Sequence, residues 1–155
     1  NAQLSSIASH IGIRESRKLV GEYVLSVDDL LSCRKFDDAI ALGDYDIDIH
    51  SPDGSGTSHY YFPDGQYYTI PYRVMTPKGA DNLLVTGRCV SAPHEAQASL
   101  RIMPTVATLG EAAGIAASLC VKDGDINIHN VNTQTLRERI IRYGGYLPNL
   151  ESDTF

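Results

Sequence analysis

The chain has 155 residues, of which 43% are hydrophobic and 21% charged, and its formal net charge is −6. A chain of this length fits one domain that buries roughly 68–70% of its unfolded surface. Its acidic balance argues against nucleic acid or an anionic membrane as a partner. Its three cysteines lie far apart in the sequence, so they form neither a disulfide framework nor a CxxC pair.

The first forty residues are predicted to contain strand, loop and one short helix. Residues 5–13 are short and mixed, as at a helix end or in a loop. Residues 17–26, with Gly21 at their centre, suit a strand with a bulge. Residues 27–32 begin with two acidic residues, which favours a short helix, and the apolar run at 36–42 favours a strand.

The stretch from residue 44 to residue 70 is predicted to be a strand, a loop and a hairpin. Residues 44–49 alternate acidic and apolar side chains, which is typical of a strand with one exposed face. Residues 51–58 are rich in Ser, Gly, Asp and Pro, which favours a loop. Residues 60–61 and 67–70 flank a turn at 62–65, and we therefore expect them to pair as a hairpin.

The second half is predicted to be mainly helical. An apolar strand is predicted at 83–86 and is followed by Gly87-Arg88. A long helix is predicted to start at Pro104, because proline fits the first turn of a helix. That helix runs to about residue 121, and its small-residue face lets the backbone approach a sheet or a planar ligand closely. The residues that recur at helical spacing on this face are Val106, Ala107, Gly110, Ala113, Gly114, Ala117 and Val121.

A further helix at 132–143 carries Leu136, Ile140 and Tyr143 on one face. With strands in the first half and helices in the second, the predicted fold class is α+β. Gly110 and Gly114 have the spacing of a transmembrane helix-dimer face, but the charged residues within and after this helix favour a soluble protein.

Three motifs in the second half follow one another in a recognisable order. They are NLLVTGR at 82–88, RIMP at 101–104 and GEAAGIAA at 110–117. This order resembles the last βα unit of FAD-dependent oxidoreductases with two dinucleotide-binding folds. HIGIRESRKLVGEYV at 10–24 and LRERIIRYGGYL at 136–147 are similar to neighbouring segments of that family.

The resemblance implies a division of the chain into three parts. Residues 1–80 correspond to a partial sheet of the substrate cap, residues 81–122 to the last βα unit of the FAD-binding domain, and residues 123–155 to a C-terminal helix and tail. The strand–GxGxxG–helix that holds the adenine dinucleotide is not found in this sequence. The expectation is a C-terminal portion of a larger flavoenzyme, whose remaining N-terminal part makes most of the FAD contacts.

The resemblance also implies which residues contact FAD. The N–H groups of Ile102 and Met103, beside Arg101, would face the pyrimidine edge of the flavin, where a helix start supplies about half a positive charge. Gly87 ends the preceding strand. Arg88 stands where many relatives carry an acid, so its contact is to a phosphate or is absent.

The candidate catalytic residues are His50, Arg73 and His94. Histidine titrates near neutrality and serves as an acid or a base, and Arg73, like Arg14, Arg17 and Arg101, suits a carboxylate-bearing substrate. For each arginine alone, a solvated or paired surface charge is the simpler interpretation. No metal is expected: alternate acidic residues at 44–48 and His50 are roughly 6–7 Å apart along a strand, too far for more than two of them to share one ion.

The leading hypothesis is therefore a fragment of a flavin-dependent oxidoreductase that transfers a hydride between a small-molecule substrate and FAD. The fragment itself is expected to be inactive, to lack FAD, and to self-associate as a homo-oligomer through its uncovered helix face. The alternative is a non-enzymatic α/β interaction module. A third hypothesis, a hydrolase in which His50 acts with Asp48, is disfavoured because the sequence contains no G-x-S-x-G motif. The compartment, the substrate and the electron acceptor remain open.

Overall fold

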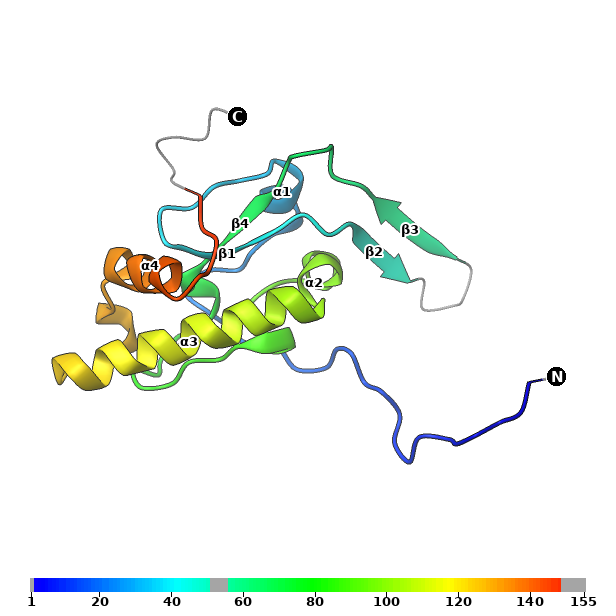
Figure 1. Ribbon diagram of the computed structural model, residues 1–155, viewed down its shortest axis with the longest axis horizontal. Coiled ribbons are helices and arrows are strands. Elements are labelled where there is room, and N and C mark those ends of the chain that lie inside the picture. Colours follow the sequence, from blue (N-terminus) through cyan, green and yellow to red (C-terminus); the bar gives the residue numbers. More distant parts are fainter. Residues whose placement is uncertain (1, 51–55, 149–155) are drawn as a thin grey trace.

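The computed structural model describes residues 2–50 and 56–148. Its strands all lie in the first half and its longer helices in the second (Figure 1), so the α+β prediction is confirmed. The elements are α1 (Val27–Leu31), β1 (Ala39–Gly43), β2 (Ile47–His50), β3 (Thr57–Tyr60), β4 (Tyr68–Pro71), α2 (His94–Leu100), α3 (Met103–Asp123) and α4 (Thr133–Arg142). Three short 3₁₀ turns join them: η1 (Tyr72–Val74), η2 (Gly87–Cys89) and η3 (Ile128–Asn130).

The strands form two antiparallel pairs rather than one sheet. β1 pairs with β4, and β2 pairs with β3 so that Ile47 lies opposite Tyr60. The expected hairpin between residues 60–61 and 67–70 is therefore wrong. Every residue of β4 is buried and every residue of β3 is exposed, and β4 thus pairs with the buried strand β1. The predicted turn is present, since the N–H of Gln66 donates to the carbonyl of Pro63.

Residues 17–26 do not form the expected strand, because they bond in turn to two different segments. The N–H groups of Leu19 and Leu25 donate to the carbonyls of Cys89 and Ser91, whereas that of Glu22 donates to Thr76. Alternating between partners prevents a continuous ladder. Gly21 is fixed at the tightest point, where an added Cβ would lie 2.8 Å from the Cβ of Ser91.

The short helix α1 forms where the sequence predicts it, and a capping box holds its start. The hydroxyl of Ser26 accepts from the N–H of Asp29, and the carboxylate of Asp29 accepts in return from the N–H of Ser26. This reciprocal pair satisfies two of the donors that a helix start leaves unpaired.

The core lies between α3, β1 and α4, with α2 packed on β2. α3 buries Leu109, Ala112 and Ala116, and it ends at Gly124, whose φ of 71° is the left-handed conformation that glycine favours. α4 buries Leu136 and Ile140 as expected. The prediction that Tyr143 lies on this buried face is wrong. It follows the last helical residue and is 64% exposed.

The predicted strand at 83–86 is wrong. The N–H of Val85 donates to the carbonyl of Met75, but residues 83–86 join no ladder. A strand needs a neighbouring strand, and within residues 2–50 and 56–148 none runs beside this segment.

The outward face of α3 meets nothing in the described structure. Gly110 and Gly114 are exposed, and no heavy atom lies within 4 Å of the position that a Cβ would occupy on either. The close packing expected of this face is therefore not made by the described residues. By length and composition alone α3 could cross a membrane, but core helices of soluble proteins pass the same test, so this is weak evidence.

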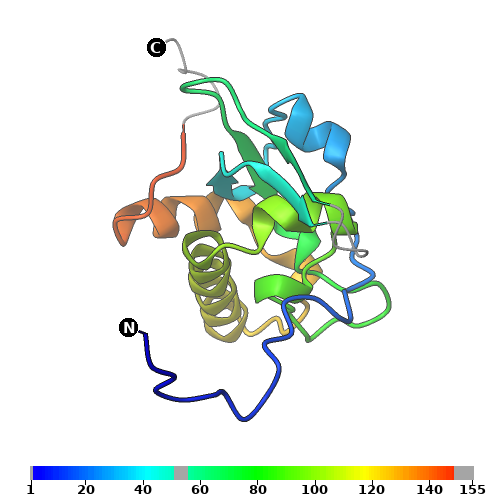
Figure 2. The ribbon, with the colours of Figure 1, turned by 90° about the vertical axis from the view of Figure 1, so that its right-hand side faces the viewer.

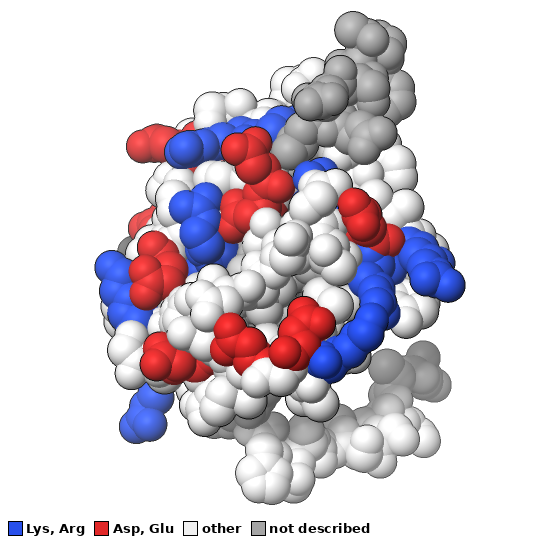
Figure 3. All heavy atoms as spheres, turned by 90° about the vertical axis from the view of Figure 1, so that its left-hand side faces the viewer, with Lys and Arg blue, Asp and Glu red and all other residues white. Residues whose placement is uncertain are grey.

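The N-terminal segment extends away from the folded body (Figure 1, Figure 2) and exposes Leu4, Ile7 and Ile11. At the opposite end of the molecule, acidic and basic side chains are interspersed on the face seen in Figure 3. That face, as far as it is described, lacks the basic stripe typical of nucleic-acid-binding proteins.

Candidate functional site

The junction between α2 and α3 is where the sequence predicts the flavin contacts. Arg101 caps the C-terminal end of α2, and its Nη2 donates to the carbonyl of Asp48 at 3.1 Å. The same nitrogen lies 3.9 Å from the carboxylate of Asp48, and the side chain is largely buried. The guanidinium of Arg101 thus holds β2 against the junction rather than facing solvent as a free anion clamp.

The start of α3 is open. Ile102 precedes the helix in an extended conformation (φ −72°, ψ 150°), and no side chain caps the helix. Met103 is the first helical residue and is 83% exposed. The first N–H groups of a helix have no partner within it and carry its partial positive charge. This end of α3 can therefore receive an anionic group.

The turn η2 lies against α3 and is built around Gly87. The φ of Gly87 is 80°, and no heavy atom lies within 4 Å of the position that its Cβ would occupy. The glycine is required by the backbone conformation, and the space beside it is open. Gly87 and Arg88 are thus brought to α3, as the motif order predicts.

Two buried oxygens near η2 lack partners among the described residues. Gln97 is fully buried, and its Nε2 donates to the carbonyl of Arg88 at 2.7 Å while its Oε1 has no partner. The hydroxyl of Thr86, which directly precedes η2, is likewise buried and unpaired. Since buried polar atoms are nearly always hydrogen-bonded, each of these two oxygens is open to a partner outside the described residues.

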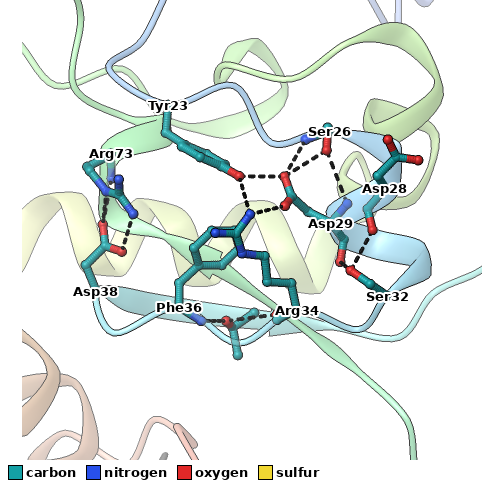
Figure 4. A network of polar contacts seen from close by, with 10 residues as sticks. Tyr23, Ser26, Asp28, Asp29, Ser32, Arg34, Phe36, Asp38 and Arg73 are labelled. Carbon is teal, nitrogen blue, oxygen red and sulfur yellow. Dashed lines mark hydrogen bonds and ion pairs between the residues drawn. The ribbon is translucent and has the colours of Figure 1, made fainter.

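Arg73 lies elsewhere, in the lining of a pocket whose volume is about 820 Å³. It forms a bidentate pair with Asp38, with nitrogen–oxygen distances of 2.9 and 3.1 Å, and it stacks over the ring of Tyr23 (Figure 4). A guanidinium in such a pair is already satisfied. In this structure Arg73 therefore stabilises the loop before β1.

A second ion pair adjoins it in Figure 4. Asp29 accepts hydrogen bonds from the hydroxyl of Tyr23 at 2.8 Å and from Arg34 at 2.9 Å. Burial alone would raise the pKa of Asp29, but its hydrogen bonds from Ser26, Tyr23 and Arg34 outweigh burial and lower that pKa. The network joins α1 to the core and leaves the carboxylate ionised.

His94 does not line the pocket of Arg73. His94 is the first residue of α2, and its Nδ1 lies 2.7 Å from the carboxylate of Glu15. His50 ends β2, and its side chain lies outside the part of the chain that is described. The structure thus places Arg73 and His94 apart from each other.

One paired histidine escaped the sequence analysis. His59 lies across the β2–β3 pair from Asp48, with its Nδ1 2.8 Å from Asp46 and its Nε2 3.6 Å from Asp48. The signal that could have identified it is the strand register, which the sequence does not specify. Within residues 2–50 and 56–148 no group of three or more potential metal ligands is present.

Comparison with known proteins gives one match. A family model described as FAD dependent oxidoreductase matches residues 1–140, which is most of the chain. No curated protein and no solved structure matches the chain.

Proposed function

The chain belongs to the FAD dependent oxidoreductase family, and we propose that it forms the C-terminal part of a flavoenzyme acting on a small-molecule substrate. When bound, FAD would supply the two-electron chemistry, accepting or returning a hydride. The chain's own contribution is to bind one edge of the flavin and to shape the substrate side of the site.

The open start of α3, a helix that also contacts η2, is the observation that supports this proposal best. The N–H groups of Ile102 and Met103 would donate to the pyrimidine edge of the flavin and stabilise its negative charge. Arg101 fixes this junction by bonding to Asp48, and the space beside Gly87 leaves room for the cofactor. The unpaired oxygens of Thr86 and Gln97 fit a ligand rich in polar groups.

The outward face of α3 is proposed to pack on the N-terminal FAD-binding part of the enzyme. Its exposed glycines, Gly110 and Gly114, allow the backbone of a partner to approach closely. Residues 81–122 then complete the FAD domain, residues 1–80 contribute to the substrate cap, and residues 123–155 follow as the C-terminal helix and tail.

Among the proposed catalytic residues, His94 has the geometry of an acid or base. Glu15 holds its Nδ1, which orients the ring and leaves Nε2 for a substrate proton. His50 is a second proposed proton carrier. Arg73 serves as a substrate clamp only if an anionic ligand displaces Asp38 from its bidentate pair.

The flavin content of two purified proteins tests this proposal. The complete product of the gene that encodes the chain should be yellow and carry about one FAD per chain. Residues 1–155 alone should be colourless, since most of the flavin contacts, especially those to adenine and diphosphate, belong to the other part. A colourless complete product would contradict a flavoenzyme, and a yellow preparation of residues 1–155 would show that the whole binding site lies in this chain.

A non-enzymatic interaction module is the second candidate, and the uncovered face of α3 is the observation that favours it. An uncovered apolar helix face tends to find a partner. We therefore expect residues 1–155 to self-associate in sedimentation experiments. A monodisperse monomer at high concentration would count against this expectation. Flavin in the complete product would decide against the interaction module.

A further inference from the structure

A second, smaller pocket lies where the N-terminal segment passes η2. Its volume is about 300 Å³, and it is lined by residues 13–17 together with Arg88 and Cys89. That volume is at the lower end of the range found for ligand sites. The lining brings together three exposed arginines from two distant parts of the sequence, Arg14, Arg17 and Arg88.

These three arginines differ from the others described above in having no recorded partner. Arg34, Arg73 and Arg101 are each bonded to an aspartate. Within the described part of the chain, no hydrogen bond or ion pair is recorded for the side chains of the pocket arginines. Three like charges around one cavity repel one another, and an anion in the pocket relieves that repulsion.

The pocket also contains one acid, Glu15, whose charge is already compensated. Lys18 forms an ion pair with one of its oxygens, and His94 binds the other at 2.7 Å. Burial raises the pKa of Glu15, but the hydrogen bonds from Lys18 and His94 outweigh burial and lower that pKa. Glu15 therefore does not neutralise the three arginines.

The backbone on both sides of the pocket is held in place. The N–H of Leu19 donates to the carbonyl of Cys89 at 2.8 Å, which ties the N-terminal segment to η2. The buried amide of Gln97 holds the carbonyl of Arg88. A site whose backbone is fixed before binding loses less entropy when a ligand arrives.

We propose that Arg14, Arg17 and Arg88 form a binding site for an oxyanion group, a phosphate or a carboxylate. The planar guanidinium presents two parallel N–H donors that match either group. The group would come from the diphosphate of a dinucleotide or from a carboxylate-bearing substrate. The site shares η2, through Arg88, with the proposed flavin site, but none of its residues belongs to α3.

Calorimetric titration of residues 1–155 at low salt tests the site, with inorganic diphosphate and succinate as separate probes. We expect saturable binding of at least one probe, weakened by added salt. Preference for diphosphate identifies a phosphate group as the ligand, and preference for succinate identifies a carboxylate. Arg14→Gln, Arg17→Gln and Arg88→Gln should each weaken binding about tenfold, as loss of a charged hydrogen bond predicts.

Arg142→Gln is the matched control, because Arg142 is an exposed arginine on α4 outside this lining. Unchanged circular dichroism would establish that each variant is folded. The proposal is overturned if neither probe binds, or if Arg142→Gln weakens binding as much as the pocket variants. This result is separable from the proposed function, since flavin in the complete gene product is measured independently of anion binding by residues 1–155.

Discussion

The arginines of this chain fall into two groups: those whose side chains are bonded to aspartates of the fold, and those that we propose to bind a ligand. Arg73 and Arg34 belong to the first group, since Asp38 and Asp29 bind them. Arg88 is proposed to belong to the second, because among the described residues its hydrogen-bond partner, Gln97, binds its backbone carbonyl and not its side chain. Arginine in a sequence does not reveal this difference. It depends on which carboxylates the fold brings within reach.

Asp29→Asn should destabilise the chain and weaken its response to acid. The folded-state pKa of Asp29 lies below its ordinary value of 3.8. The contribution of Asp29 to the free energy of unfolding is therefore fully present above pH 3.8 and is lost as the pH falls through the lower, folded-state pKa. Removing a buried acceptor of charged hydrogen bonds costs about 1.5–3 kcal/mol. Urea unfolding from pH 7 to pH 2 measures both effects.

The control for this variant is Asp28→Asn, because Asp28 is exposed on the same helix. It should change the free energy of unfolding by less than about 1 kcal/mol. Equal losses in the two variants would mean that the network around Asp29 contributes nothing beyond charge at the helix start.

Gly43→Ala should destabilise the β1–β4 pair. An added Cβ would lie 2.6 Å from Cζ of Tyr68, a fully buried ring whose hydroxyl is hydrogen-bonded to Ser99. Such overpacking costs about 1–3 kcal/mol. Thermal unfolding should show the loss, while Gly12→Ala, which has no heavy atom within 4 Å, should leave the midpoint almost unchanged. A stable Gly43→Ala chain would show that Tyr68 can move.

At the scale of elements, the sequence predicted three of the four described helices and the strands near β1, β2 and β4, but it missed α2 and did not predict how the strands pair. The signals for α1, α3 and α4 are local: acidic residues at a start, Pro104, Gly124 and the spacing of buried side chains. Strand pairing depends on distant segments. Residues 17–26 and 83–86 have strand-like composition but no continuous partner among the described residues.

Gly110→Ala and Gly114→Ala should each stabilise residues 1–155. Both glycines lie inside α3 and face open space, and alanine favours a helix interior over glycine by about 1 kcal/mol. In the complete gene product the same variants should weaken packing on the FAD-binding part and lower flavin content. The free energy of unfolding of each variant, measured in residues 1–155 and in the complete gene product, shows whether the substitution has opposite effects in the two proteins. Stabilisation in both proteins would show that nothing packs closely on this face.

For the whole molecule, the sequence motifs predicted some residues of the candidate site but not the side chains with which the site residues pair. The turn η2, which contains Gly87 and Arg88, contacts α3, as the motif order predicts. The pairing of Arg73 with Asp38 and of His94 with Glu15 could not be predicted, because each joins residues far apart in the chain. The unpaired oxygen of Gln97 could not be predicted from the sequence either, since it depends on how α2 packs beside η2.

The central claim is that the start of α3 contacts the flavin, and the reduction potential of the complete gene product tests it most directly. Met103→Pro removes one N–H with little strain, because proline suits the first helical position and Ile102 is already extended. Met103→Ala keeps that N–H and is the matched control.

Both variants should retain FAD. Relative to Met103→Ala, the potential of Met103→Pro should fall by about 30–60 mV. That is the equivalent of one charged hydrogen bond for a two-electron couple. Equal potentials in the two variants, with full flavin content in both, would contradict a flavin contact at Met103 and leave α3 a structural helix only.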